Sequence, residues 1–146
     1  MTHADIINHT AKWLKKHSQN IAVPNCNTIL KELKSATESG EIPDIIAWCS
    51  WASVLVEVKT SRSDFLKDRF KPFRISPAKG VGNFRYYISP PNIIKQNEVP
   101  EYWGLLQINE KREIEIIKVA QNQFANTDCE RTILLSLIRR NKILTL

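Results

Sequence analysis

The sequence contains few of the residues that form disulfides or soft-metal sites. Its three cysteines stand far apart, are odd in number and form no CxxC pair, which excludes a disulfide framework and a zinc finger. The three histidines show no ligand spacing, and surface positions are expected for them. The cysteines are expected to be small core residues in a reducing cytoplasm. The residues concerned are Cys26, Cys49, Cys129, His3, His9 and His17.

Long hydrophobic runs and glycine motifs are also missing. The N-terminal region lacks the apolar core of a signal peptide, and no run approaches the ~20 residues of a membrane span. Only four glycines are present, without a Gly-x-Ser-x-Gly elbow or a Walker or Rossmann pattern. The KGVGN segment at 79–83 is too sparse and lacks the required strand–helix setting. These absences predict a soluble cytoplasmic protein with no membrane partner.

Positive charge is present and is concentrated in one segment. Lysine and arginine together exceed the acidic residues by six, 21 against 15. Residues 59–85 hold eight basic side chains and two acidic ones, so this segment alone accounts for the excess. Such a concentration attracts phosphate backbones, acidic proteins or anionic lipid surfaces, or forms a solvated basic face.

The periodicity of apolar residues predicts a sheet with helices around it. Helical spacing indicates a helix over 3–18 and a second over 62–70, which Ser61 or Ser63 can cap and Pro72 ends. It also indicates a C-terminal helix capped by Thr127 or Asp128. The C-terminal helix should bury a stripe of Ile133, Leu134, Leu137 and Ile138. Residues 28–38 fit a helix or a strand equally well. Short apolar runs predict strands at 44–49, 53–59, 84–89, 104–108 and 113–119. A single α/β or α+β domain over 1–146 is expected.

Three charged residues interrupt the stretch EIPDIIAWCSWASVLVEVKT, residues 41–60. If its two strands form a hairpin turning at Ser50–Trp51, residue numbers facing each other sum to 101, and Asp44 lies opposite Glu57. Lys59 projects from the same face, because it is two residues further along the strand. No Asn-Gly or Asp-Gly determines the turn, and an odd register shift would separate the carboxylates.

Two opposed carboxylates repel each other unless one is protonated or a cation lies between them. Hard oxygen ligands favour Mg²⁺, which takes one or two carboxylates and completes its shell with water and phosphate. The alternative is a surface Glu57–Lys59 pair with an unrelated loop aspartate at position 44. Spacing alone leaves both interpretations open.

Several segments resemble a known family. "PD" at Pro43–Asp44, followed after a hairpin-length gap by "EVK" at 57–59, resembles the motif of the PD-(D/E)xK nuclease superfamily. The segments VEVKTSRSDFLKDRFKPFR (56–74), YYISPPNII (86–94) and VPEYWGLL (99–106) are similar to MmcB-like DNA-repair proteins within it. The resemblance covers roughly residues 28–120. It implies a restriction-endonuclease-like fold, a mixed central β-sheet flanked by helices.

The resemblance also implies roles for individual residues. Asp44 and Glu57 would be the metal ligands, for Mg²⁺ or Mn²⁺, and Lys59 the catalytic lysine. Members often add a glutamate from a preceding element, and Glu32 fits better than Glu38 or Glu41 because its Glu-Leu setting and its gap to the aspartate match. Ser61, Arg62 and Asp64 match the post-motif segment, where Ser61 and Asp64 can also form a helix cap.

The resulting expectation is a metal-dependent nuclease that hydrolyses DNA phosphodiester bonds in repair or processing. Its basic segment would contact DNA mainly through the phosphate backbone, independently of base sequence. Catalytically silent alternatives are a nucleic-acid-binding module or an adaptor that meets an acidic partner. The basic residues expected to contact DNA are Arg62, Lys67, Arg69, Lys71, Arg74 and Lys79.

Overall fold

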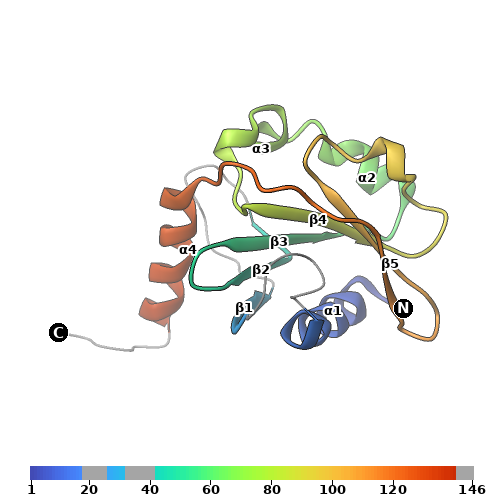
Figure 1. Cartoon of the computed structure of the whole chain (residues 1–146), viewed down its shortest axis with the longest axis horizontal. Helices are drawn as coiled ribbons and strands as arrows, with labels where there is room; N and C mark the ends of the chain where they lie inside the picture. The colour runs from blue at the N-terminus through green and yellow to red at the C-terminus, as the bar shows by residue number, and fades with distance from the viewer. Residues whose placement is uncertain (18–25, 32–41, 141–146) are drawn as a thin grey trace.

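The computed structural model describes residues 1–17, 26–31 and 42–140, which contain one six-stranded mixed sheet (Figure 1). The strands lie side by side in chain order. The pairings β3–β4 and β4–β5 are parallel and the others are antiparallel. The strands are β1 (Thr28–Lys31), β2 (Ile45–Trp48), β3 (Ser53–Val58), β4 (Phe84–Ser89), β5 (Gly104–Ile108) and β6 (Ile114–Lys118).

Helices cover both faces of the sheet. Helix α1 (His3–His17) packs on one face, and α2 (Arg62–Asp68) and α3 (Pro72–Ile75) pack on the other (Figure 1). Helix α4 (Thr127–Arg140) stands beside one end of the sheet. The α+β class, with a mixed sheet flanked by helices, is confirmed. Two 3-10 turns, η2 (Pro77–Lys79) and η3 (Gln96–Glu98), complete the described elements.

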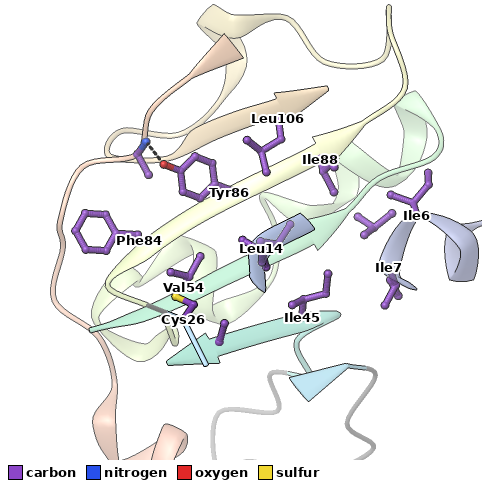
Figure 2. Close-up of a cluster of buried hydrophobic side chains, with 14 of the residues drawn as sticks. Ile6, Ile7, Leu14, Cys26, Ile45, Val54, Phe84, Tyr86, Ile88 and Leu106 are labelled. Carbon is purple, nitrogen blue, oxygen red and sulfur yellow. Dashed lines mark hydrogen bonds between the residues drawn. The ribbon is translucent and has the colours of Figure 1, made fainter. Parts of the chain in front are cut away.

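The core on the α1 face follows from strict alternation along the central strands. Val54, Val56 and Val58 of β3 pack with α1 residues such as Ile6 and Leu14 (Figure 2). Tyr86 of β4 lies in the same layer, and its hydroxyl accepts a 3.0 Å hydrogen bond from the backbone N–H of Ala120. The predicted apolar face of the second hairpin strand is therefore confirmed.

The opposite face carries a second core. Leu55 of β3 and Tyr87 of β4 pack there with Phe65 of α2 and with Trp103, whose ring stacks on Tyr87 at 4.3 Å between centroids. Helix α4 adds Cys129 and Ile133 to this cluster. Because both faces of β3 and β4 are covered, every residue of these two strands is buried.

The predicted elements agree with the structure to within one or two residues, with three differences. Residues 28–31, which fitted a helix or a strand equally well, form a strand. Pro72 begins α3, since proline suits the first turn of a helix, and α2 ends earlier at Asp68. Asn126, and not Thr127 or Asp128, caps α4 through a 3.1 Å bond from the Cys129 N–H. Ile138 is 42% exposed, outside the buried stripe.

No helix among the described residues is long and apolar enough to span a membrane.

Candidate active site

The β2–β3 hairpin has the register predicted from its alternation. Ile45 pairs with Val56 and Trp48 with Ser53, so facing residue numbers sum to 101. Asp44 directly precedes this ladder and lies at the position opposite Glu57. The Val58 N–H donates a 2.8 Å hydrogen bond to Asp44 Oδ2, which holds the aspartate against the end of β3. The hairpin therefore brings the two carboxylates to the same end of the sheet, close enough for the charge of Asp44 to act on Glu57.

Glu57 is an acidic side chain in a buried position, with 4% of its surface exposed. Burial, together with the nearby charge of Asp44, raises its pKa to about 8 against the opposing charges of Arg74, Lys71 and Lys59. Arg74 Nη2 lies 3.6 Å from Glu57 Oε1. At neutral pH this raised pKa favours the protonated form of Glu57.

Lys59 lies on the same side of β3 as Glu57, as predicted. Only 7% of Lys59 is exposed, and its Nζ donates a 3.1 Å hydrogen bond to Asp68 Oδ1. Its backbone N–H continues the parallel pairing with β4 by donating to the Ile88 carbonyl at 2.9 Å. Strand pairing fixes the lysine backbone, and Asp68 fixes the position of its ammonium group.

Asp68 is the centre of this ionic cluster and is fully buried. Lys71 Nζ lies 2.8 Å from Oδ1, Arg74 Nε donates to Oδ2 at 2.8 Å, and the Tyr87 hydroxyl also donates to Oδ2. Burial opposes ionisation of Asp68, but the charge of Arg74, the bonds from Lys71 and Tyr87, and the charge of Lys59 hold its pKa well below the usual range. Asp68 is thus an ionised carboxylate that orients three cations.

One sequence position at the N-terminus also reaches the site. His3 Nε2 lies 3.4 Å from Asp44 Oδ2, and 45% of its side chain is exposed. The prediction of a surface position is confirmed, but the histidine is adjacent to the candidate carboxylates. No sequence spacing indicated this contact, because it depends on how α1 packs across the sheet.

Of the two predicted caps of α2, Ser61 and Ser63, the structure has Ser61. Its hydroxyl accepts a 3.2 Å bond from the Asp64 N–H. The cap fixes where α2 begins and thereby directs Phe65 and Asp68, three residues apart, toward the sheet.

The predicted DNA-contacting residues fall into two groups. Lys67, Arg69 and Lys79 are exposed on α2, its C-terminal turn and η2. Arg62 is engaged with Glu98 through both terminal nitrogens, one at 2.6 Å, and also donates to the Ile93 carbonyl. Lys71 is half-buried against Asp68. The exposed basic surface is therefore smaller than the sequence suggested.

Two arginines of the basic run are not on the surface, which corrects the expectation that the run as a whole contacts DNA. The Arg74 side chain is 3% exposed and pairs with Asp68. Arg85 is fully buried and donates to the carbonyls of Gly82, Pro77, Gly80 and Phe124 at 2.8–3.0 Å. Arg74 organises the site, and Arg85 joins chain segments.

The candidate third carboxylate, Glu32, and its alternatives Glu38 and Glu41 lie outside the described residues. Within residues 1–17, 26–31 and 42–140, no three His, Cys, Asp or Glu side chains gather closely enough to hold a metal ion together. Among the predicted metal ligands, Asp44 and Glu57 are therefore the two carboxylates that the described residues offer to a metal ion.

Asp68 and Tyr87 were not predicted as parts of the site, and Arg74 was predicted only as a contact to DNA. Asp68 had one usable signal, since it lies three residues after Phe65 on the helix face that is buried. Tyr87 had none, because its place beside Glu57 depends on the parallel β3–β4 register. Arg74 was counted with the surface cations because a basic run does not reveal which member turns inward.

The chain matches no protein-family model and no curated protein. It is similar in structure to a protein of unknown function from Silicibacter pomeroyi, with a TM-score of 0.62 and 18% sequence identity. The match covers 92% of this chain and 84% of the other. At this identity the likeness shows the fold alone.

Proposed function

We propose that this protein is a metal-dependent nuclease that hydrolyses DNA phosphodiester bonds, with Asp44, Glu57 and Lys59 at its active site. The observation that carries the proposal is the hairpin register, which opposes the two carboxylates and puts Lys59 on the same face. These are the residues that match the PD-(D/E)xK pattern, and they meet at one end of the sheet.

The two carboxylates suit a hard divalent cation. Mg²⁺ commonly binds one or two protein carboxylates and takes its other ligands from water and substrate phosphate, so a third protein carboxylate is not required. Burial of Glu57 beside Asp44 makes a second negative charge unfavourable in the metal-free protein. Asp44 and Glu57 would hold Mg²⁺ or Mn²⁺, which when bound polarises the scissile phosphate and lowers the pKa of a water.

The chain's own residues supply the remaining functions. Lys59 Nζ would hold a phosphate oxygen or the attacking water and stabilise negative charge as it develops. Asp68 acts as a positioning residue, because it holds both Lys59 and Arg74 without itself lying at the surface. Lys67, Arg69 and Lys79 would contact backbone phosphates, which predicts a salt-dependent affinity with little sequence preference.

The test is cleavage of plasmid, linear and branched DNA with Mg²⁺, Mn²⁺ or EDTA. Asp44→Asn keeps an oxygen to accept the Val58 N–H but removes the charge, and Lys59→Ala removes the ammonium. Matched controls are Asp128→Asn and Lys111→Ala, both at exposed positions far along the chain. Cleavage should require a divalent metal and fall at least about a hundredfold in the two site variants only. Equal cleavage by all five proteins would refute the proposal.

A second candidate is supported by one specific observation. Lys59 and Arg74 are already paired with Asp68, and Arg74 also lies against Glu57, so the cluster neutralises much of its own charge. Such a cluster suits a nucleic-acid-binding module that keeps the fold without turnover. This candidate predicts salt-dependent DNA binding that EDTA does not change, no heat signal when Mg²⁺ is titrated into the protein, and no cleavage.

A further inference from the structure

A hollow of about 490 Å³ lies next to the ionic cluster, and we refer to it as the Phe124 pocket. It is lined by Arg85 of β4 and by three chain segments: 73–78 from α3 and η2, the 100–103 loop before β5, and 122–124 after β6. The Gln121 N–H donates to the Tyr102 carbonyl at 2.8 Å, which ties the second and third segments together. A volume between ~300 and 1,000 Å³ is typical of small-ligand sites.

The pocket is joined to the candidate active site by shared residues. Arg74 lines the pocket, and its guanidinium lies 4.7 Å from the centre of the Trp103 ring and 3.6 Å from Glu57 Oε1. Trp103 also lines the pocket and stacks on Tyr87, which donates to Asp68. A group in the pocket would therefore lie one side chain away from the proposed reacting centre.

Hydrogen bonds from Arg85 fix the positions of the pocket walls. Its guanidinium donates to the carbonyls of Pro77 and Gly80 on one wall and of Phe124 on another, each at 3.0 Å. These bonds join η2 to the loop after β6, so the walls are placed by buried hydrogen bonds. The pocket is formed before a ligand enters, which lowers the ordering cost of binding.

The lining combines aromatic faces with hydrogen-bonding groups. Phe124 is 74% exposed and Tyr102 is 43% exposed, so both present ring surface to solvent. Asn122, Gln123 and Glu101 add amide and carboxylate groups. Within the described residues, the buried Nε2 of Gln123 has no hydrogen-bond partner, so turning this amide toward a ligand breaks no bond made by that nitrogen.

We propose that the Phe124 pocket binds an unpaired nucleobase of a DNA strand whose backbone crosses the neighbouring basic surface. A nucleobase has a flat face for Phe124 and Tyr102 and an edge of donors and acceptors for the amides and Glu101. This inference rests on the proposed function and specifies its substrate class: DNA with unpaired bases, such as single strands, flaps or branch points.

The charge around the pocket favours a nucleic acid over a protein side chain. Lys79 is exposed beside the pocket residues Pro77 and Ala78, and Lys71, which is half-buried against Asp68, directly precedes the helix that carries Phe73. Glu101 is the single acidic residue that lines the pocket among the described residues. An anionic backbone with flat bases matches both the cationic flank and the aromatic rim.

Fluorescence anisotropy in EDTA tests the pocket without catalysis. The probes are a labelled single-stranded oligonucleotide and an abasic strand of equal length, which carries the same phosphates but no bases. The variants are Phe124→Ala and, as a matched control, Phe70→Ala. Phe70 is 70% exposed and does not line the pocket. Thermal melting checks that both variants fold, and a free deoxynucleoside monophosphate serves as competitor.

The wild type should bind the base-containing strand about tenfold more tightly than the abasic strand, the scale of one stacked base. Phe124→Ala should abolish this preference and Phe70→Ala should retain it. Equal binding of both strands by the wild type, as expected of a pocket that takes a protein side chain, would overturn the inference. So would equal losses in the two variants, or a mononucleotide that competes as well as the strand.

The outcome is separable from that of the nuclease test. A base preference in EDTA without cleavage in Mg²⁺ would retain the pocket and reject the enzyme. Metal-dependent cleavage without a base preference would retain the enzyme and reject the pocket as a base-binding site.

Discussion

Substitution of Glu57 by glutamine should change how the stability of the metal-free protein depends on pH. The folded protein raises the pKa of this carboxyl from 4.5 to about 8 because the group is buried beside Asp44. Between these values the folded state binds a proton that the unfolded state has lost. Stability must therefore fall as pH rises through this window, and the contribution of protonated Glu57 is complete only below about pH 4.5.

The size of the effect follows from the same two values. A pKa change of one is about 1.4 kcal/mol, so a rise from 4.5 to about 8 gives an upper limit of about 5 kcal/mol. Entry of water and relaxation of the site lower the cost of the buried charge. We expect a wild-type slope of about −1 kcal/mol per pH unit between pH 5.5 and 7.5 that comes from this group.

Urea unfolding in EDTA over this pH range measures the slope. Glu57→Gln removes the titrating group while keeping its shape, so the variant should match the wild type near pH 5 and exceed it at pH 8. Glu115→Gln is the matched control, because this glutamate also lies on a strand but is exposed. Parallel pH profiles for wild type and Glu57→Gln would refute the reasoning about burial.

Three other substitutions test the framework of the site. Asp68→Asn should destabilise the protein at pH 7 by about 3 kcal/mol, because it leaves buried cations without their partner. Since the folded protein lowers the pKa of Asp68, the difference in stability from the wild type should shrink as pH falls below about 4. An unchanged unfolding midpoint at pH 7 would contradict this. Arg85→Lys should lower the free energy of unfolding in urea by about 2 kcal/mol or more, because hydrogen bonds to carbonyls are lost. Unchanged stability with a weaker affinity for DNA would mean that Arg85 contacts DNA and does not join chain segments. Gly104→Ala should lower the melting temperature, because its Cβ would lie 2.3 Å from the Tyr86 ring; no change would mean that the ring moves freely.

Much of the fold could be predicted because its strands are strongly patterned. The run Ser53–Val58 and the run Phe84–Ser89 are short, apolar and bounded by polar residues, and both form the predicted strands. Pro72 was predicted to end the helix before it, but it begins α3. Proline can follow one helix or begin another, and only the path of the chain across the sheet decides which. Helix α4 kept its buried Ile133 but exposes Ile138, because the stripe that packs on the core consists of Cys129, Ile133 and Leu137, and Ile138 lies beside it.

The candidate site also contains features that could be predicted from the sequence and features that could not. The pairing of Asp44 with Glu57 was predictable from hairpin arithmetic, although no turn motif guaranteed the register. The inward turn of Arg74 and the burial of Asp68 were not predictable, because an isolated helix gives no reason to bury either charge. Burial of Asp68 and Arg74 becomes favourable only when the two charges are buried together as a pair.

The sequence by itself determined which side chains share a face of β3. Successive residues of a strand point to opposite sides, so Val54, Val56 and Val58 had to separate from Glu57 and Lys59 whatever the rest of the chain did. Tertiary structure alone decided what those charges meet. Asp68 reaches Lys59 from a helix that folds back over the sheet, and Tyr87 reaches Asp68 because β4 runs parallel to β3. Contacts of this kind depend on the crossover between the strands, and local periodicity carries no information about it.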